Sequence, residues 1–201
     1  MPPDDNSVNI KNRAPYHHGD LRARLVEEGM RLLERPGSKG VGLREVARAV
    51  GVSATAIYRH FPDKGALLRA IAERGFALMG EMQLQAASRA SGKAAFAASG
   101  AAYVHFALAH PAVFRLMFAS APPRDLFSLD FCDLSMPLRL LRDHVAALAP
   151  PGATEAARKI ASIHAWSLVH GLAVLALDGM VLVDDEMIAG VIGEGKAAVL
   201  F

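Results

Sequence analysis

The sequence has little of what a β-sheet, a disulfide or a cysteine metal cluster needs. Aromatic residues make up 6% of its 201 residues, and Cys132 is the one cysteine. A single cysteine excludes a disulfide within the chain and a cysteine-based metal cluster. Runs of β-branched residues are scarce and alanine is abundant, which favours packed helices over sheets. We expect an all-α protein that needs no metal or other cofactor.

Charge of one sign is also missing from the chain as a whole, whose formal net charge is +2. The basic residues gather near the front, because residues 11–69 hold 12 Lys and Arg against 6 Asp and Glu. Residues 81–201 hold 9 against 11. A basic front before an apolar, slightly acidic rear is typical of a protein that meets a polyanion. A chance division of charge is the alternative interpretation.

Two uncharged stretches, residues 94–114 and 160–177, approach the length of a membrane span. Both contain serine and histidine, and neither has the leucine density or the basic flanks of a span. Buried helices explain both stretches. The first residues are acidic and lack the apolar segment of a signal peptide. We therefore expect no membrane insertion and a cytoplasmic location.

The front of the chain is predicted to form a helix over 20–35 and then two short helices over 43–50 and 54–61. A further, longer helix follows and reaches about residue 79. Gly51 is a helix-ending residue, and Ser53 is suited to cap the third helix. Two short amphipathic helices joined by Gly-Val-Ser, after a longer helix, are typical of a helix-turn-helix.

The third helix presents small and polar residues outward. At about 100° per residue, five positions point outward or lie at the edge: Thr55, Ala56, Tyr58, Arg59 and His60. Small side chains let a helix enter the major groove of DNA, while hydroxyls and cations reach bases and phosphates. A solvated helix face with an edge tyrosine is the alternative interpretation.

At these residues the sequence resembles the TetR/AcrR family of bacterial transcription regulators. The resemblance covers residues 16–76 and is most specific over 43–71, LREVARAVGVSATAIYRHFPDKGALLRAI. It implies a flexible basic arm over 1–15, a three-helix DNA-binding domain over 16–79, and a helical bundle for ligand binding and dimerisation over 80–201. It also implies a homodimeric repressor, not an enzyme, that binds a near-palindromic DNA operator and is released by a small-molecule effector.

The resemblance also implies which residues contact DNA. Arg44, at the start of the second helix, can reach phosphate or groove, and Lys64 matches the family lysine whose charge faces the phosphate backbone. Ser53 both caps the third helix and can donate to phosphate. Tyr58 and His60 match phosphate-contacting positions of the family. The whole expected set is Arg44, Ser53, Ala54, Thr55, Tyr58, Arg59, His60 and Lys64.

The sequence departs from the family pattern in two ways that affect this set. Gly42 stands where the family usually has Ser or Thr, so the second helix lacks a better cap. Alanine on both sides of Thr55 leaves few direct base contacts. We expect specificity to depend also on DNA shape and on Lys11 and Arg13 of the arm in a minor groove.

The rear is predicted to form helices over 93–109, 111–119, 130–148, 154–179 and 184–199. Residues 165–171 resemble the Trp-His-Gly signature of one TetR-family C-terminal domain. Trp166 and His170 are four residues apart and share a helix face. The expected ligand-binding residues are Tyr103, His105, Phe106, Met117, Phe118, Phe127, Trp166 and His170. Core packing around a hydrogen-bonded histidine is the alternative for each of them.

The last two expected helices are more apolar than one subunit can bury, which favours a four-helix interface across a two-fold axis. Two other classes of protein compete with a regulator: an enzyme, and a helical protein whose basic front docks an acidic partner. The sequence has no glycine-rich phosphate loop, metal-ligand spacing or nucleophile elbow, so we expect no enzyme. Salt-dependent, sequence-selective binding to duplex DNA distinguishes a regulator from both alternatives.

Overall fold

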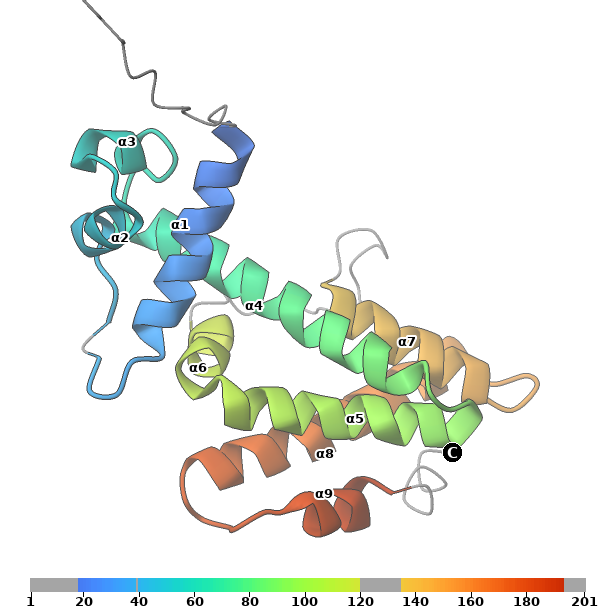
Figure 1. Ribbon diagram of the computed structural model, residues 1–201. Coiled ribbons are helices and arrows are strands. Elements are labelled where there is room, and N and C mark those ends of the chain that lie inside the picture. Colours follow the sequence, from blue (N-terminus) through green and yellow to red (C-terminus); the bar gives the residue numbers. More distant parts are fainter. Residues whose placement is uncertain (1–17, 39, 120–134, 194–201) are drawn as a thin grey trace, which may run out of the picture.

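The computed structural model describes residues 18–38, 40–119 and 135–193, and every regular element in these ranges is a helix (Figure 1). The helices are α1 (His18–Leu33), α2 (Leu43–Val50), α3 (Ala54–Tyr58), α4 (Lys64–Ala87), α5 (Gly92–Ala109), α6 (Pro111–Ala119), α7 (Met136–Leu148), α8 (Glu155–Leu177) and α9 (Asp185–Ile192). The expected all-α fold is therefore confirmed. The arm over 1–15, Phe127, Cys132 and residues 194–199 lie outside the described residues.

Helices α1–α3, which we call the head, lie at one end of α4 (Figure 1). Gly51 ends α2 in the left-handed region at φ 78°, and Ser53 then caps α3. Ile57 and Phe61 turn inward and are buried, so the turn between α2 and α3 is fixed by packing as well as by backbone geometry. Helix α3 is shorter than expected, because it ends at Tyr58 and leaves His60 in the following turn.

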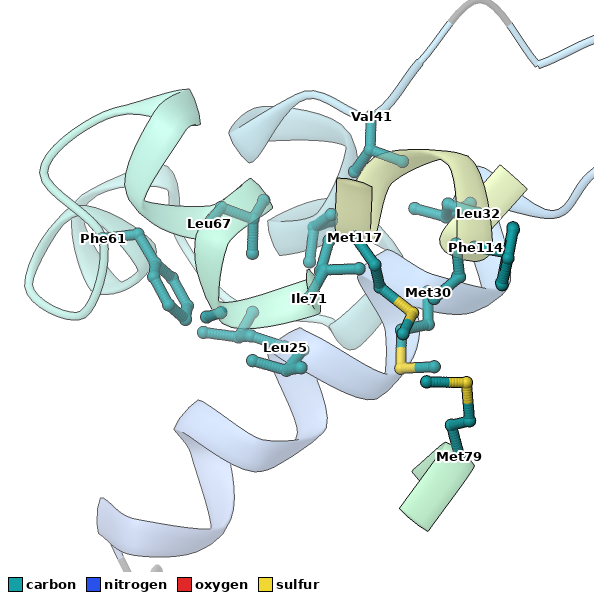
Figure 2. Packing of buried hydrophobic residues seen from close by; sticks show 14 of the residues in the cluster. Leu25, Met30, Leu32, Val41, Phe61, Leu67, Ile71, Met79, Phe114 and Met117 are labelled. Atoms are coloured by element: carbon teal, nitrogen blue, oxygen red, sulfur yellow. The ribbon is translucent and has the colours of Figure 1, made fainter. Parts of the chain in front are cut away.

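Helix α4 is longer than expected and crosses the predicted domain boundary at residue 80. It continues to Ala87 because residues 81–87, EMQLQAA, are good helix formers with no breaker among them. One hydrophobic cluster runs along it from the head into the helices that follow. Figure 2 shows Phe61 at one end of this cluster and Phe114 at the other, with Met30, Met79 and Met117 among the residues between α1, α4 and α6. The two predicted domains share this core.

Helices α5–α9, which we call the rear bundle, gather around the other end of α4 (Figure 1). Helix α5 packs against α4, α8 and α9, and α7 packs against α4 and α8. Gly80 is the point where α7 approaches α4, because an added Cβ there would lie 2.6 Å from Met136. A second, smaller cluster joins Val104 of α5 to Ile188 and Ile192 of α9.

Candidate functional site

The outer surface of α3 carries small and hydroxyl-bearing side chains on a firmly capped helix. The Ser53 hydroxyl oxygen accepts a hydrogen bond from the Ala56 amide at 3.2 Å, which satisfies one of the free donors of the first turn. Ala54 and Thr55 are exposed, and Tyr58 is 46% exposed. Helix α3 thus offers a low-relief face with a hydroxyl group and an aromatic edge.

Exposed cations surround this face without acidic partners. Arg44 begins α2, Arg59 caps the end of α3 and Lys64 begins α4, and all three are exposed. No acidic side chain of the described residues pairs with any of them. By contrast, Arg74 farther along α4 donates to Glu27 at 2.7 Å. Unpaired cations beside a narrow helix can neutralise phosphates without first breaking an internal ion pair.

The structure adds one cation that the expected set lacks. Arg48 is exposed in the last turn of α2, four residues after Arg44 and therefore on the same side of the helix. The four-residue spacing between Arg44 and Arg48 is the sequence signal that could have identified Arg48. His60 of the expected set is half-buried, with its ring 6.5 Å from that of Phe61.

A second constellation lies in the rear bundle, where α5 meets α8. The Tyr103 hydroxyl lies 2.8 Å from His170 Nδ1 and accepts a hydrogen bond from Trp166 Nε1 at 3.3 Å. A hydroxyl that accepts from Trp166 can still donate its own proton to Nδ1, an arrangement that fits a neutral imidazole with its proton on Nε2. Burial favours this form, because it lowers the pKa of His170 and raises that of Tyr103.

Helix α6 completes this constellation with two phenylalanine rings. The ring of Phe118 lies 4.7 Å from that of His170 and 6.4 Å from that of Trp166. Phe114, which the expected set lacks, lies 5.6 Å from His170 and meets Tyr103 edge-on at 5.7 Å. Its spacing of four from Phe118 is the signal for it. We call Tyr103, Phe114, Phe118, Trp166 and His170 the aromatic cluster.

Three other expected ligand-binding residues lie elsewhere. His105 is a correction to the expected grouping, because it is about 200° around α5 from Tyr103 and its Nε2 lies 3.0 Å from Asp185 Oδ1 of α9. Phe106 is fully buried and packs against His110. Met117 faces α4, where its sulfur would lie 2.8 Å from a Cβ added at Gly75.

Helices α8 and α9 and the connection between them expose many large apolar side chains, which we call the exposed apolar face. Its members are Ile160, Ile163, Leu168, Leu175, Met180, Val181, Leu182 and Met187. Ile188 and Ile192 of α9 do not belong to this face, because they are buried against α5. By length and composition α8 is also apolar enough to cross a membrane, and 28% of its apolar window is buried. Large exposed apolar side chains in such number mark an interaction surface.

Two family models match this chain. The model described as "Bacterial regulatory proteins, tetR family" matches residues 25–71, which include α2, α3 and most of α1. The model described as "Tetracyclin repressor-like, C-terminal domain" matches residues 96–189. The second match covers the aromatic cluster and most of the exposed apolar face, and the Trp-His-Gly subtype stays a prediction.

Individual proteins agree with these matches. The chain is 35% identical over 66 residues to the HTH-type transcriptional regulator AcrR of Shigella flexneri, a match that spans 33% of this chain and 31% of that regulator. A protein of unknown function from Rhodococcus sp. RHA1 is 32% identical with a TM-score of 0.67, covering 94% of this chain and 97% of the other. A TetR family transcription regulator from Marinobacter aquaeolei VT8 shares the fold, with 17% identity, a TM-score of 0.56 and coverage of 88% and 94%.

Proposed function

Since this chain belongs to the TetR family of bacterial transcription regulators, we propose that it is a homodimeric repressor that binds a near-palindromic operator and is released by a small molecule. The observation that carries this proposal is the α3 surface, a capped helix of small side chains among exposed cations that have no acidic partner in the described part of the chain. Such a surface fits the major groove and its phosphates. We assign the chain no catalytic activity and place it in the cytoplasm with the DNA.

The DNA contacts divide between positioning and base reading. Arg44, Arg59 and Lys64 are exposed where they can neutralise phosphates, which supplies affinity without sequence information. Thr55 is the polar side chain best placed on the exposed face of α3 to contact a base edge. Because its neighbours are alanines, we expect thymine methyl contacts and DNA shape to add to the selectivity.

The exposed apolar face of α8 and α9 supports the homodimer. A two-fold axis through this face would bury it against the same face of a second copy, as an isologous interface requires. Figure 1 shows the head at the end of the molecule away from α8 and α9. Two copies joined in this way would each direct one α3 outward, to successive major grooves about 34 Å apart or more.

The aromatic cluster supports the effector site. It combines apolar rings from α6 and α8 with the hydrogen-bonding groups of Tyr103, Trp166 and His170. Small-molecule sites have this composition, a mostly apolar wall with a few polar groups that fix orientation. With His170 Nδ1 directed at Tyr103, its Nε2–H is the donor left for an acceptor atom of the effector.

The test of this function is selection of duplex DNA from a random pool by the purified protein at about 150 mM salt, where specific binding is typically well separated from non-specific binding. We expect enrichment of a palindrome. If four cations per subunit contact phosphate, the logarithm of the affinity of the dimer should fall with the logarithm of salt concentration with a slope of about −7. A folded dimer that enriches no duplex and shows no salt dependence would contradict the proposal and favour a module that docks an acidic protein.

Single substitutions then test the placement of the DNA surface. Arg44→Ala and Lys64→Ala should each reduce the magnitude of the salt slope by about 2, because each removes one phosphate contact per subunit. Arg89→Ala is the matched control, since Arg89 is exposed beyond the far end of α4. A control that weakens binding as much as the two test variants would show that net charge, and not this surface, decides affinity.

A further inference from the structure

A carboxylate of the head caps the first turn of α6. Glu34 directly follows α1, and its two carboxylate oxygens each accept a backbone hydrogen bond, from the Ala112 amide at 3.2 Å and the Val113 amide at 2.8 Å. Residues 112 and 113 are the second and third of α6, where amide groups have no partner inside the helix. A carboxylate at this end is also favoured by the helix dipole.

These two bonds join parts of the chain that the sequence keeps far apart. Glu34 begins the connection from α1 to α2, and its partners lie 78 and 79 residues later. Among the hydrogen bonds of the described residues, they are the ones between the head and the rear bundle. Apolar packing also joins these two parts, because Met30 and Leu32 of α1 and Phe114 of α6 belong to the same buried cluster (Figure 2).

The other side of α6 touches the proposed effector site. Phe114, the residue after Val113, packs on Tyr103 and His170, and Phe118, four residues later, packs on His170 and Trp166. Helix α6 has only nine residues, so a displacement of its rings by a bound molecule moves its first turn as well. Helix α4 limits the directions of that movement, because Met117 and Val113 already lie against Gly75.

We propose that Glu34 is the positioning residue that couples the aromatic cluster to the DNA-binding head, by holding the first turn of α6 to the start of the α1–α2 connection. This inference rests on the proposed function. When the rings of Phe114 and Phe118 move, the Ala112 and Val113 amides move with them and carry Glu34 and the connection to α2. By linkage, DNA bound at the head must then change the environment of the aromatic cluster, without any effector present.

Trp166 reports on this coupling, because it is the single tryptophan of the chain and a member of the aromatic cluster. The experiment titrates the full-length protein with the duplex enriched from the random pool and follows tryptophan emission and DNA binding separately. We expect the wild-type emission to change on binding. In Glu34→Gln, which keeps the shape but removes the charge, we expect DNA binding to persist and the emission change to be lost.

Glu28→Gln is the matched control, because it removes the same charge from a nearby residue, in the helix that Glu34 follows, that pairs with Arg31 and not with α6. It should keep the emission change. Retention of that change in Glu34→Gln, its loss in Glu28→Gln, or its absence from the DNA-bound wild type would each overturn the coupling role of Glu34. Failure of the wild type to bind any duplex would instead defeat the proposed function itself, and the binding titration shows this directly.

Discussion

The head and the rear bundle distribute polar and apolar side chains in opposite ways. In the head, the described buried side chains are all apolar, and the exposed side chains of α2 and α3 are charged, polar or small apart from Tyr58. From the second half of α4 onward, the interior also holds the buried polar side chains Gln83, Ser99 and Ser162. Most of the large exposed apolar side chains also lie there, up to Leu182 with 94% of its surface exposed.

This difference shows that the head buries its apolar side chains within one chain, whereas the rear bundle leaves apolar side chains for a second chain to cover. The head encloses its apolar residues and leaves cations for a polyanion. The rear bundle leaves the α8–α9 face exposed. Where it packs on α4, the buried Gln83 Oε1 has no hydrogen-bond partner among the described residues, and an unsatisfied buried acceptor lowers stability. A DNA-binding part needs a core that is buried within one chain. A part that dimerises and holds a ligand needs an exposed apolar face and an interior with polar groups.

The largest expected effect tests how much the buried apolar core of the head contributes to stability. Phe61 is 1% exposed and packs in the shared core, so Phe61→Ala should lower the free energy of unfolding by about 3 to 5 kcal/mol. Urea denaturation measures this loss. Tyr58→Ala is the matched aromatic control in the same segment, because Tyr58 is 46% exposed and should cost far less. Equal losses for both variants would remove the distinction between the inner and outer faces of α3.

The next effect tests whether the rear is open. Leu168 is 37% exposed on α8, and Leu168→Arg would place an unpaired charge in the proposed dimer interface. We expect the dimer dissociation constant to rise by a factor of about 100 to 4,000, because burying an unpaired charge costs about 3 to 5 kcal/mol. Sedimentation velocity at several concentrations measures it.

Leu84→Arg is the control for this variant, since Leu84 is 50% exposed on α4 and lies outside the α8–α9 face. It should leave the dimer intact. A Leu168→Arg protein that stays dimeric as tightly as the wild type would place the interface elsewhere.

A smaller effect concerns the polar interior of the rear bundle. Burial lowers the pKa of His170 below its ordinary value of 6.5, so the unfolded chain takes up a proton before the folded chain does as the pH falls. The stability that neutral His170 contributes is therefore fully present above pH 6.5 and declines as the pH drops from there toward its lowered pKa. His170→Gln should flatten this decline in urea unfolding measured between neutral and mildly acidic pH.

His164→Gln serves as the comparison, because His164 is an exposed histidine on the same helix. If that variant flattened the pH profile as strongly, or if His170→Gln left it unchanged, the decline would not come from the burial of His170.

Local features were the predictable ones. Gly51, Ser53 and the spacing from 43 to 50 placed α2 and the start of α3, because capping and periodicity act within one turn. The same locality explains why Trp166 and His170, four residues apart, do lie in one cluster. His105 was misplaced because two residues along a helix turn a side chain to the opposite face, whereas Tyr103 four residues after Ser99 stays inward.

Contacts between distant segments were beyond the sequence. Glu34 meets α6 across 78 residues, and nothing in its own neighbourhood distinguishes it from Glu27 or Glu28. The length of α4 was also missed, because a helix without a breaker ends where tertiary packing stops supporting it. Membership of the TetR family fixes the general arrangement, while contacts such as the Glu34 cap follow from how these particular side chains pack.

The smallest expected effect sharpens the account of the head. Gly42 caps α2 in an extended conformation, at φ −114° and ψ 146°, without a side-chain hydrogen bond, and an added Cβ would meet no atom within 4 Å. Gly42→Ser should therefore stabilise the protein, by a few tenths of a kcal/mol from the cap and up to about 1 kcal/mol from the stiffer unfolded chain. Gly51→Ser is the contrasting variant, because its surroundings are equally open but its φ of 78° strains a side-chain-bearing residue. Thermal unfolding should show a higher Tm for the first variant and a lower Tm for the second. A lower Tm for both variants would mean that the head depends on the absence of a side chain at Gly42. The head would then be less self-contained than its comparison with the rear bundle indicates.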